Sequence, residues 1–233
     1  MRQLQYRDLG LIDYKTCWDY QETLFAESVR RKIAIRNGED EHAPLNHLLF
    51  LEHPPVFTLG KSGDEAHLLR TPEELAATGY SYYKINRGGD ITYHGPGQLV
   101  GYPIFDLEQF FTDIHRYLRT LEEAMILLLA EYRIEAGRID GLTGVWIGMG
   151  TDNPRKICAM GVKCSRWVTM HGFALNVNSR LDDFKLIVPC GIDDKDVTGM
   201  ERELGKPVEM DEVKERLRVH IANLFDADLV FGA

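Results

Sequence analysis

The sequence is poor in cysteine and has no closely spaced cysteine pair. Its four cysteines, Cys17, Cys158, Cys164 and Cys190, form no CxxC motif. Because a structural zinc site usually takes its ligands in close pairs, the sequence predicts no such site. Disulfides are not expected in a cytoplasmic chain of this size. Three of the cysteines are expected to be small buried residues, and Cys190 is the one to consider for chemistry.

Long apolar runs and an excess of positive charge are absent as well. The longest strongly apolar stretch, Met125–Ala130, is far too short to cross a bilayer. The first residues lack the apolar core of a secretory signal. The net charge of −9 argues against a general binder of nucleic acid or anionic membranes, which needs a basic surface. We therefore expect a cytoplasmic protein that binds neither nucleic acid nor membrane.

The sequence does contain a glycine-rich stretch, Arg87–Tyr102 (RGGDITYHGPGQLVGY), with five glycines. Without side chains, glycines let main-chain N–H groups approach a ligand closely. Short β-type runs surround the stretch, at Ser81–Ile85, Asp90–Tyr93 and Gln98–Phe105. The combination predicts strands and a loop that line a ligand site. Within it, Arg87–Gly89 fits either an anion site or an ordinary hairpin turn.

Hydrophobic periodicity predicts an α+β fold. Helices are expected to follow Asp13 and Thr71 and to cover Asp113–Tyr132 and Asp211–Phe225; the first has an apolar stripe of Tyr14, Trp18, Phe25, Val29 and Ile33. Further strands are expected at Gln3–Leu11, Leu48–Glu52, Val56–Leu59, Val145–Met149, Lys156–Cys164, Trp167–His171 and Ala174–Val177. We expect a mixed β-sheet with packed helices, in a single catalytic domain over residues 1–233, with a small C-terminal lobe over 191–233 as an option.

Cys190 is a candidate nucleophile. It lies between Pro189 and Gly191, which favour a tight, non-helical backbone on which a thiol is presented. A buried structural cysteine is an equal alternative on this local pattern, because a reactive thiol needs an activating partner.

Lys156 is the candidate partner of that thiol. Strict alternation along the strand would place Lys156, Cys158 and Met160 on one face. An ammonium ion on the apolar side of a strand is costly to bury without a partner, and a thiolate would be such a partner. The alternative is a solvated lysine just after the predicted turn at Asp152–Pro154.

Two histidines and a basic stretch complete the candidates. His94 and His171 each fit a general base, a ligand-orienting donor or a structural residue. The basic stretch could guide an acidic partner or be a solvated face, and consists of Arg155, Lys156, Lys163 and Arg166.

Four motifs occur in order along the chain: Arg87–Gln98 (RGGDITYHGPGQ), Arg155–Lys163 (RKICAMGVK), His171–Asn176 (HGFALN) and Pro189–Ile192 (PCGI). Together they resemble the lipoyl(octanoyl) transferases, of the biotin/lipoate protein ligase superfamily. The resemblance extends from about Leu45 to Leu204.

This resemblance implies a biotin/lipoate ligase-like catalytic domain. It implies transfer of an octanoyl group from octanoyl-acyl carrier protein to a specific lysine of a lipoyl domain, in lipoate biosynthesis. The acceptors would be lipoyl domains of 2-oxoacid dehydrogenase acyltransferase subunits and the glycine cleavage H protein. No nucleotide, metal or redox cofactor is implied.

Residue by residue, Cys190 matches the family's nucleophile, which carries the octanoyl group as a thioester. Lys156 matches the lysine that lowers the pKa of that thiol and moves protons. The segments that match the acyl site consist of Arg87, Gly88, Gly89, Asp90, Ile91, Thr92, Tyr93, His94, Ala159, Met160, Gly161, Gly172, Phe173 and Ala174.

Two other functions stay open. An ATP-dependent lipoate or biotin ligase shares the fold, but it makes an acyl-adenylate and needs no Pro-Cys-Gly nucleophile. A non-catalytic acyl-binding protein would use Cys190 only structurally. The presence of this cysteine and the lack of a recognisable adenylate-binding loop favour the transferase.

Acyl transfer also needs oxyanion donors and an apolar tunnel. Main-chain N–H groups near Gly172–Ala174 or Gly88-Gly89 are the candidate donors. Tyr93 and the alternating residues of Ala159–Gly161 are the expected tunnel walls.

Overall fold

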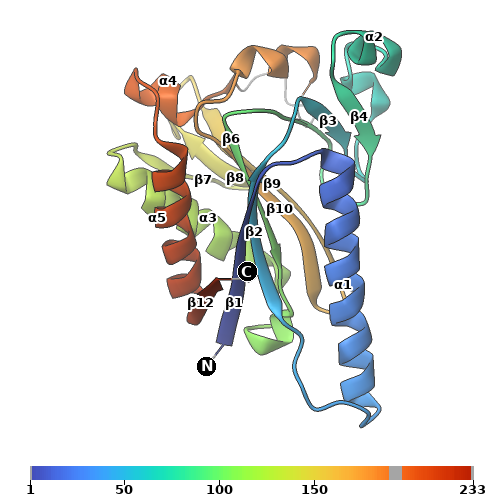
Figure 1. The fold of residues 1–233 in the computed structure, drawn as a ribbon. Coiled ribbons are helices and arrows are strands. Elements are labelled where there is room, and N and C mark those ends of the chain that lie inside the picture. Colours follow the sequence, from blue (N-terminus) through green and yellow to red (C-terminus); the bar gives the residue numbers. More distant parts are fainter. Residues whose placement is uncertain (1, 189–195, 232–233) are drawn as a thin grey trace.

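A mixed β-sheet forms the centre of the computed structural model, which describes residues 2–188 and 196–231 (Figure 1). From one edge to the other the strands are β12 (Ala227–Phe231), β1 (Arg2–Leu11), β2 (Asn46–Glu52), β6 (Gln98–Ile104), β10 (Val168–Asn176), β9 (Arg155–Ser165), β8 (Leu142–Ile147) and β7 (Ala136–Ile139). The short strand β11 (Asp196–Val197) adds to β9 in parallel. The pairs of β1 with β12 and β2 are parallel, and the pairs from β2 to β7 are antiparallel.

A second, three-stranded sheet stands beside the first. Its order is β4 (Ser81–Lys84), β3 (Val56–Leu59) and β5 (Ile91–His94), with α2 (Pro72–Ala77) next to it. The strands predicted around the glycine-rich stretch are therefore divided between two sheets, since β4 and β5 join the small sheet and β6 joins the central one. The glycine-rich stretch connects the two sheets.

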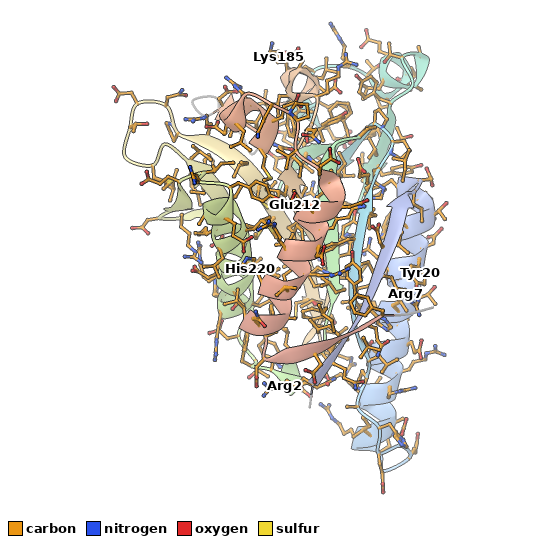
Figure 2. The ribbon with its side chains drawn as sticks, turned by 60° about the vertical axis from the view of Figure 1, so that its left-hand side comes forward. Arg2, Arg7, Tyr20, Lys185, Glu212 and His220 are labelled. Carbon is orange, nitrogen blue, oxygen red and sulfur yellow. The ribbon has the colours of Figure 1, made fainter. Side chains whose placement is uncertain are left out.

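Helices cover both faces of the central sheet (Figure 1). On one face α1 (Tyr14–Arg36) packs over β6 and β10; on the other lie α3 (Ile114–Glu131) and α5 (Met210–Leu224), which contact each other. Figure 2 shows His220 and Glu212 along α5, and His220 Nε2 lies 2.7 Å from a carboxylate oxygen of Glu131 on α3. A short helix, α4 (Met200–Leu204), precedes α5. The mixed sheet with packed helices confirms the predicted fold class.

Three of the predicted helix starts are confirmed by their caps. Asp13 accepts a hydrogen bond from the N–H of Thr16, and Asp113 accepts one from Arg116. Thr71 and Glu74 form the predicted capping box. Such caps satisfy main-chain donors that the first turn of a helix leaves unpaired.

The predicted stripe of α1 is partly wrong. Tyr14 and Phe25 are buried, but Ile33 is 42% exposed because the last turns of α1 extend past the sheet. The buried face instead contains Tyr14, Cys17, Gln21, Leu24, Phe25 and Ser28. The helix predicted over Asp113–Tyr132 is confirmed as α3, and its apolar face is buried, with Tyr117, Leu121, Met125 and Leu128 fully covered.

Strand β10 is one strand where the sequence predicted two. The pattern breaks at Gly172 and Phe173, yet both pair with β9. A Cβ on residue 172 would lie 2.1 Å from the carbonyl oxygen of Gly101, so only glycine lets β6 and β10 come this close. The turn before β10 has positive φ at Arg166 (53°) and Trp167 (63°), as in two-residue type I′ hairpins.

Among the described strands and α-helices, four short ones were not predicted: β7, β11, α4 and β12. Each has five residues or fewer, too few to show a hydrophobic period. Of the cysteines, Cys17 and Cys158 are buried as expected, while Cys164 is partly exposed. The described helices contain none long and apolar enough to cross a membrane.

A buried carboxylate ties α3 to the β7–β8 hairpin. Glu122 is fully buried; one of its oxygens accepts the N–H of Gly144 (2.9 Å), and the other accepts from Arg119 (2.7 Å) and Arg138 (2.9 Å). Among the described residues, the next one, Glu123, pairs with Arg138 alone, and it is partly exposed. The hairpin that flanks β9 is thus fixed mainly through Glu122.

Replacing Glu122 by glutamine should lower the free energy of unfolding by about 2 kcal/mol, because charge-assisted hydrogen bonds are lost in a buried place. Glu123→Gln, a matched control one residue away, should cost less than about 1 kcal/mol because its ion pair is solvent-exposed. Urea unfolding followed by circular dichroism measures both. Equal losses in the two variants would contradict this account of Glu122.

Candidate active site

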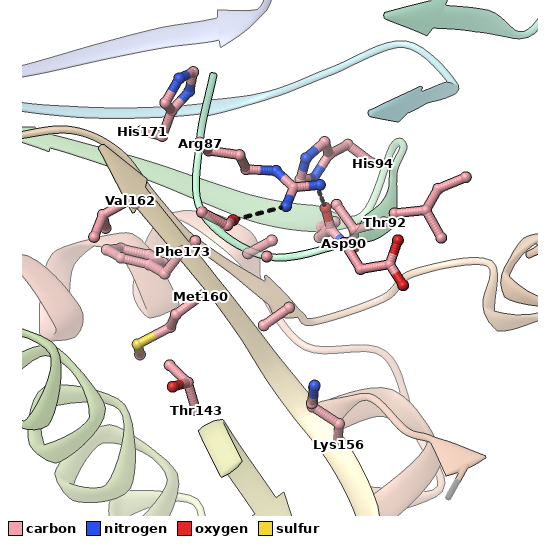
Figure 3. A pocket seen from close by; sticks show the side chains of 18 of the residues that line it. Arg87, Asp90, Thr92, His94, Thr143, Lys156, Met160, Val162, His171 and Phe173 are labelled. Atoms are coloured by element: carbon pink, nitrogen blue, oxygen red, sulfur yellow. Dashed lines mark hydrogen bonds between the residues drawn. The ribbon is translucent and has the colours of Figure 1, made fainter. Parts of the chain in front are cut away.

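A cavity of about 360 Å³ lies between the glycine-rich stretch and strands β9 and β10 (Figure 3). It brings together three motifs that are distant in the sequence. Predicted site residues that line it are Arg87, Gly88, Gly89, Asp90, Ile91, Thr92, His94, Lys156, Ala159, Met160, Gly161, Gly172, Phe173 and Ala174. Other lining residues include Tyr14, Gln98, Tyr102, Leu142, Thr143, Val162, His171 and Asn176.

The glycine-rich loop rests on an open edge of β9. Strand β8 pairs with β9 only along Arg155–Cys158, so no strand of the described chain pairs with the later residues of β9 on that side. Gly88 donates its N–H to the carbonyl oxygen of Val162 at 2.9 Å. A Cβ on Gly161 would lie 2.8 Å from the carbonyl oxygen of Gly88, so a side chain there would push the loop away.

Arg87 fastens this loop to the small sheet. Its side chain is buried, and Nη2 donates to the carbonyl oxygen (2.7 Å) and hydroxyl oxygen (3.0 Å) of Thr58, while Nη1 donates to the carbonyl oxygen of Gly88 (3.1 Å). Asp90, at the other end of the loop, accepts from His67 Nδ1 (2.5 Å) and from the N–H of Asp64 (3.2 Å). Both charged residues therefore hold the loop in place.

A β-bulge directs Lys156 to the cavity, and the predicted alternation is wrong at this point. Trp146 pairs with Lys156 and Val145 pairs with Cys158, so Ile157 is an extra residue in β9. Cys158 consequently lies in the core under α3, whereas Lys156 shares the face of Trp146 and lines the cavity. Its Nζ lies 4.7 Å from the centre of the Trp146 ring, a cation–π contact (Figure 3 shows the side chain).

Cys190 lies outside the described residues, but the described chain on both sides of it is anchored at the cavity. Val188 donates its N–H to the carbonyl oxygen of His67, the residue bonded to Asp90. After the gap, Val197 pairs with Lys156 and lines the cavity, and Thr198 donates its N–H to the carbonyl oxygen of Lys156 at 2.9 Å.

A relay of amide groups fixes the tautomer of His94. Asn176 Nδ2 faces a carbonyl oxygen, that of Thr198 (2.9 Å), so its Oδ1 must accept from Gln98 Nε2 (2.9 Å). Gln98 Oε1 then faces His94 Nδ1 at 2.8 Å, and this nitrogen carries the hydrogen. Nε2 of His94 is left as an acceptor.

His171 is fixed in the same way. Asn86 Nδ2 donates to the carboxylate of Glu22 (3.0 Å), so its Oδ1 accepts from His171 Nε2 (2.9 Å) and Nδ1 is the acceptor. Burial is the main cause that lowers the pKa of both His94 and His171 to about 3. At neutral pH each ring is uncharged, so its second nitrogen accepts a hydrogen bond and does not donate one.

Tyr93 does not line the cavity. Its side chain is buried with Phe57 and Phe184 on the other side of β5, and its hydroxyl donates to Asp183 at 2.6 Å. Of the relay residues, Gln98 was recognised from the sequence only as a hydrogen-bonding group of the glycine-rich stretch, and Asn176 was not singled out. Both fall inside recognised motifs, which was the available signal.

The basic stretch is largely paired within the protein. Arg155 makes two hydrogen bonds to Glu203 (2.7 and 2.6 Å), and Lys163 pairs with Glu22 (3.3 Å). Arg166 is exposed in the β-turn. Within residues 2–188 and 196–231 no three or more His, Cys, Asp and Glu side chains are arranged to hold a metal ion.

Several known proteins are similar to this chain in sequence or in fold. The family model of the lipoyl protein ligase A/B catalytic domain matches residues 13–222. The chain is 60% identical over 230 residues to an octanoyltransferase from Flavobacterium johnsoniae (98% of this chain, 99% of the relative). It is 63% identical over 224 residues to one from Cytophaga hutchinsonii (94% and 91%). A bi-partite lipoate protein ligase from Thermoplasma acidophilum has a TM-score of 0.69 at 17% identity (100% and 87% covered), which shows the fold alone.

The fold and the family model define the catalytic domain of a lipoate ligase-type enzyme. The chain belongs to the lipoyl(octanoyl) transferases of this superfamily, acyltransferases that move an octanoyl group in lipoate biosynthesis. The resemblance seen in the four motifs is confirmed.

The buried histidines should make the protein less stable in mild acid. Burial lowers the pKa of His53 to about 4 and of His94 and His171 to about 3, whereas the unfolded chain protonates them near pH 6.5. Below pH 6.5 the unfolded state binds more protons, so stability falls by roughly 1.4 kcal/mol per pH unit for each group. Urea unfolding between pH 7 and pH 5 measures this slope.

One substitution isolates a histidine contribution to that slope. His53→Gln should reduce the slope by nearly one proton per molecule. A wild-type stability that is constant from pH 7 to pH 5 would show that the buried imidazoles do take up protons in the folded state.

Proposed function

We propose that the protein transfers an octanoyl group from octanoyl-acyl carrier protein to a lysine of a lipoyl domain, through a thioester on Cys190. The acceptors we propose are lipoyl domains of 2-oxoacid dehydrogenases and the glycine cleavage H protein. One observation carries the proposal. A single cavity gathers Lys156 with two other motifs, and the chain leading into and out of the PCGI motif is anchored beside it.

The reaction is balanced without a nucleotide. The Cys190 thiolate attacks the carbonyl carbon of the donor thioester, a new C–S bond forms, and the bond to the carrier sulfur breaks, with a proton going to that sulfur. The acceptor amine then attacks the enzyme thioester, an amide bond forms, and the cysteine thiolate leaves. The first step exchanges one thioester for another, and the second makes a more stable amide.

Lys156 has the surroundings that its proposed role requires. Its ammonium group lies over the Trp146 ring and faces the cavity, so it can favour a thiolate there. Partial burial makes a lysine able to give up its proton, after which the amine can take one from the incoming acceptor. The neutral His94 and His171 have pKa values too low for this task at neutral pH.

For the oxyanion we propose the N–H of Gly89. Phe173 and Ala174 pair with strands on both sides, so their main-chain groups belong to the sheet, and Gly88 donates to Val162. Among the described residues none accepts a hydrogen bond from the N–H of Gly89, which lines the cavity. A donor placed where negative charge develops stabilises the transition state.

For the acyl chain we propose the apolar part of the lining. Met160, Val162 and Phe173 present side chains there, with Leu142 nearby, and Ala159 and Gly161 leave space between them. Pockets of this kind bind apolar groups mainly by removing surface from water.

Mixing the protein with octanoyl-acyl carrier protein should add one octanoyl group, detected by intact mass spectrometry. Hydroxylamine should remove the adduct, because it cleaves thioesters, and Cys190→Ser should form no such adduct. Cys164→Ser, at a partly exposed cysteine outside the cavity, is the control and should form it normally. A wild-type protein that stays unmodified, or that needs ATP and Mg²⁺, would refute the covalent mechanism.

Lys156→Ala should raise the pKa of the Cys190 thiol, since a nearby positive charge is lost. The measurement is the rate of iodoacetamide alkylation of the Cys190 peptide against pH. Lys163→Ala removes a lysine from the same strand that does not line the cavity, and its profile should match the wild type. If Lys156→Ala also keeps the wild-type profile, Lys156 does not act on the thiol.

A further inference from the structure

We propose that Asn176 is a positioning residue for acyl transfer, which holds the main chain of Lys156 through Thr198. The inference rests on the proposed function, because it assigns a role at the same site. Asn176 is the last residue of β10, is 4% exposed, and lines the cavity.

The contact runs through two hydrogen bonds. Asn176 Nδ2 donates to the carbonyl oxygen of Thr198 at 2.9 Å, and the N–H of Thr198 donates to the carbonyl oxygen of Lys156 at 2.9 Å. The carboxamide of Asn176 is itself held by Gln98, so it has one orientation. Asn176 therefore connects the end of β10 to the residue that carries the cavity ammonium.

This connection matters because the neighbouring strand pairing is short. Strand β11 has two residues, Asp196 and Val197, and pairs with β9 only at Arg155 and Lys156. Two ladder positions next to a bulge define a register weakly. The buried bond from Asn176 also fixes the carbonyl group of Thr198 and so limits how Lys156 and Thr198 can shift against each other.

Asn178 offers a matched control two residues away. It too is an asparagine whose Nδ2 donates to a carbonyl oxygen, that of Val208 (2.8 Å), and whose Oδ1 accepts the N–H of Val208 (2.9 Å). This pair fixes the segment before α5 and does not line the cavity. Asn178→Leu therefore removes a comparable amide anchor without touching Lys156.

The test compares Asn176→Leu with Asn178→Leu in the full chain. The readout is the single-turnover rate of octanoyl adduct formation at saturating octanoyl-acyl carrier protein, together with the melting temperature. Asn176→Leu should lower the rate about 100-fold, the size expected when a reacting group is misplaced by about 1 Å. Asn178→Leu should lower the melting temperature but keep a rate near that of the wild type.

Asn176→Asp supplies a second readout that does not depend on folding alone. One carboxylate oxygen still accepts from Gln98, and the other meets the carbonyl oxygen of Thr198, to which it donates only when protonated. Burial raises the pKa of such a carboxyl group. The rate of this variant relative to the wild type should therefore fall as pH rises through that pKa, and Asn176→Leu should show no such dependence.

The outcomes separate the two claims. If the wild type forms no adduct, the proposed function fails before the role of Asn176 is reached. If the wild type is acylated and the two leucine variants react at the same rate, the positioning role of Asn176 is overturned. A pH-independent relative rate for Asn176→Asp would overturn it as well.

Discussion

In the part of the chain that the structure describes, strand β9 has a strand partner on its β8 side along its first residues only, and the site depends on this uneven pairing. In the paired part, the bulge at Ile157 directs Lys156 away from the core and over Trp146. In the part that β8 does not pair with, the carbonyl oxygen of Val162 accepts a hydrogen bond from the N–H of Gly88. One strand thus presents the lysine and anchors the glycine-rich loop, and the cavity is the space between them.

Features that depend on short-range pattern could be predicted from the sequence. The caps at Asp13 and Thr71 and the apolar face of α3 follow from local hydrogen bonding and a 3.6-residue period. Three of the motifs also identified much of the cavity lining, because several residues of each line the cavity. The bulge at Ile157 could not be predicted, because the sequence of β9 does not show whether the strand carries an extra residue relative to its partner.

Contacts between residues that are far apart in the sequence could not be predicted either. The pattern around Tyr93 does not show whether its side chain points to the cavity or to the small apolar core on the other side of β5. In the structure it lies in that core, where Asp183 accepts a hydrogen bond from its hydroxyl. The role of Gln98 likewise depends on Asn176, which is far away in the sequence and adjacent only after β6 and β10 pair. Such partners are set by sheet order, which local periodicity does not determine.

The electrostatics of the cavity explain why it contains histidines that do not titrate near neutral pH. Burial and neighbouring positive groups hold His94 and His171 neutral, and amide relays give each a single tautomer. A charged imidazole here would compete with Lys156 for a thiolate and would oppose protonation of its amine. With both rings neutral, the proposed mechanism assigns to Lys156 the change of charge that accompanies the reaction of the Cys190 thiol. In that mechanism, proton transfer and thiolate stabilisation would depend on one side chain and on the main-chain contacts that hold it.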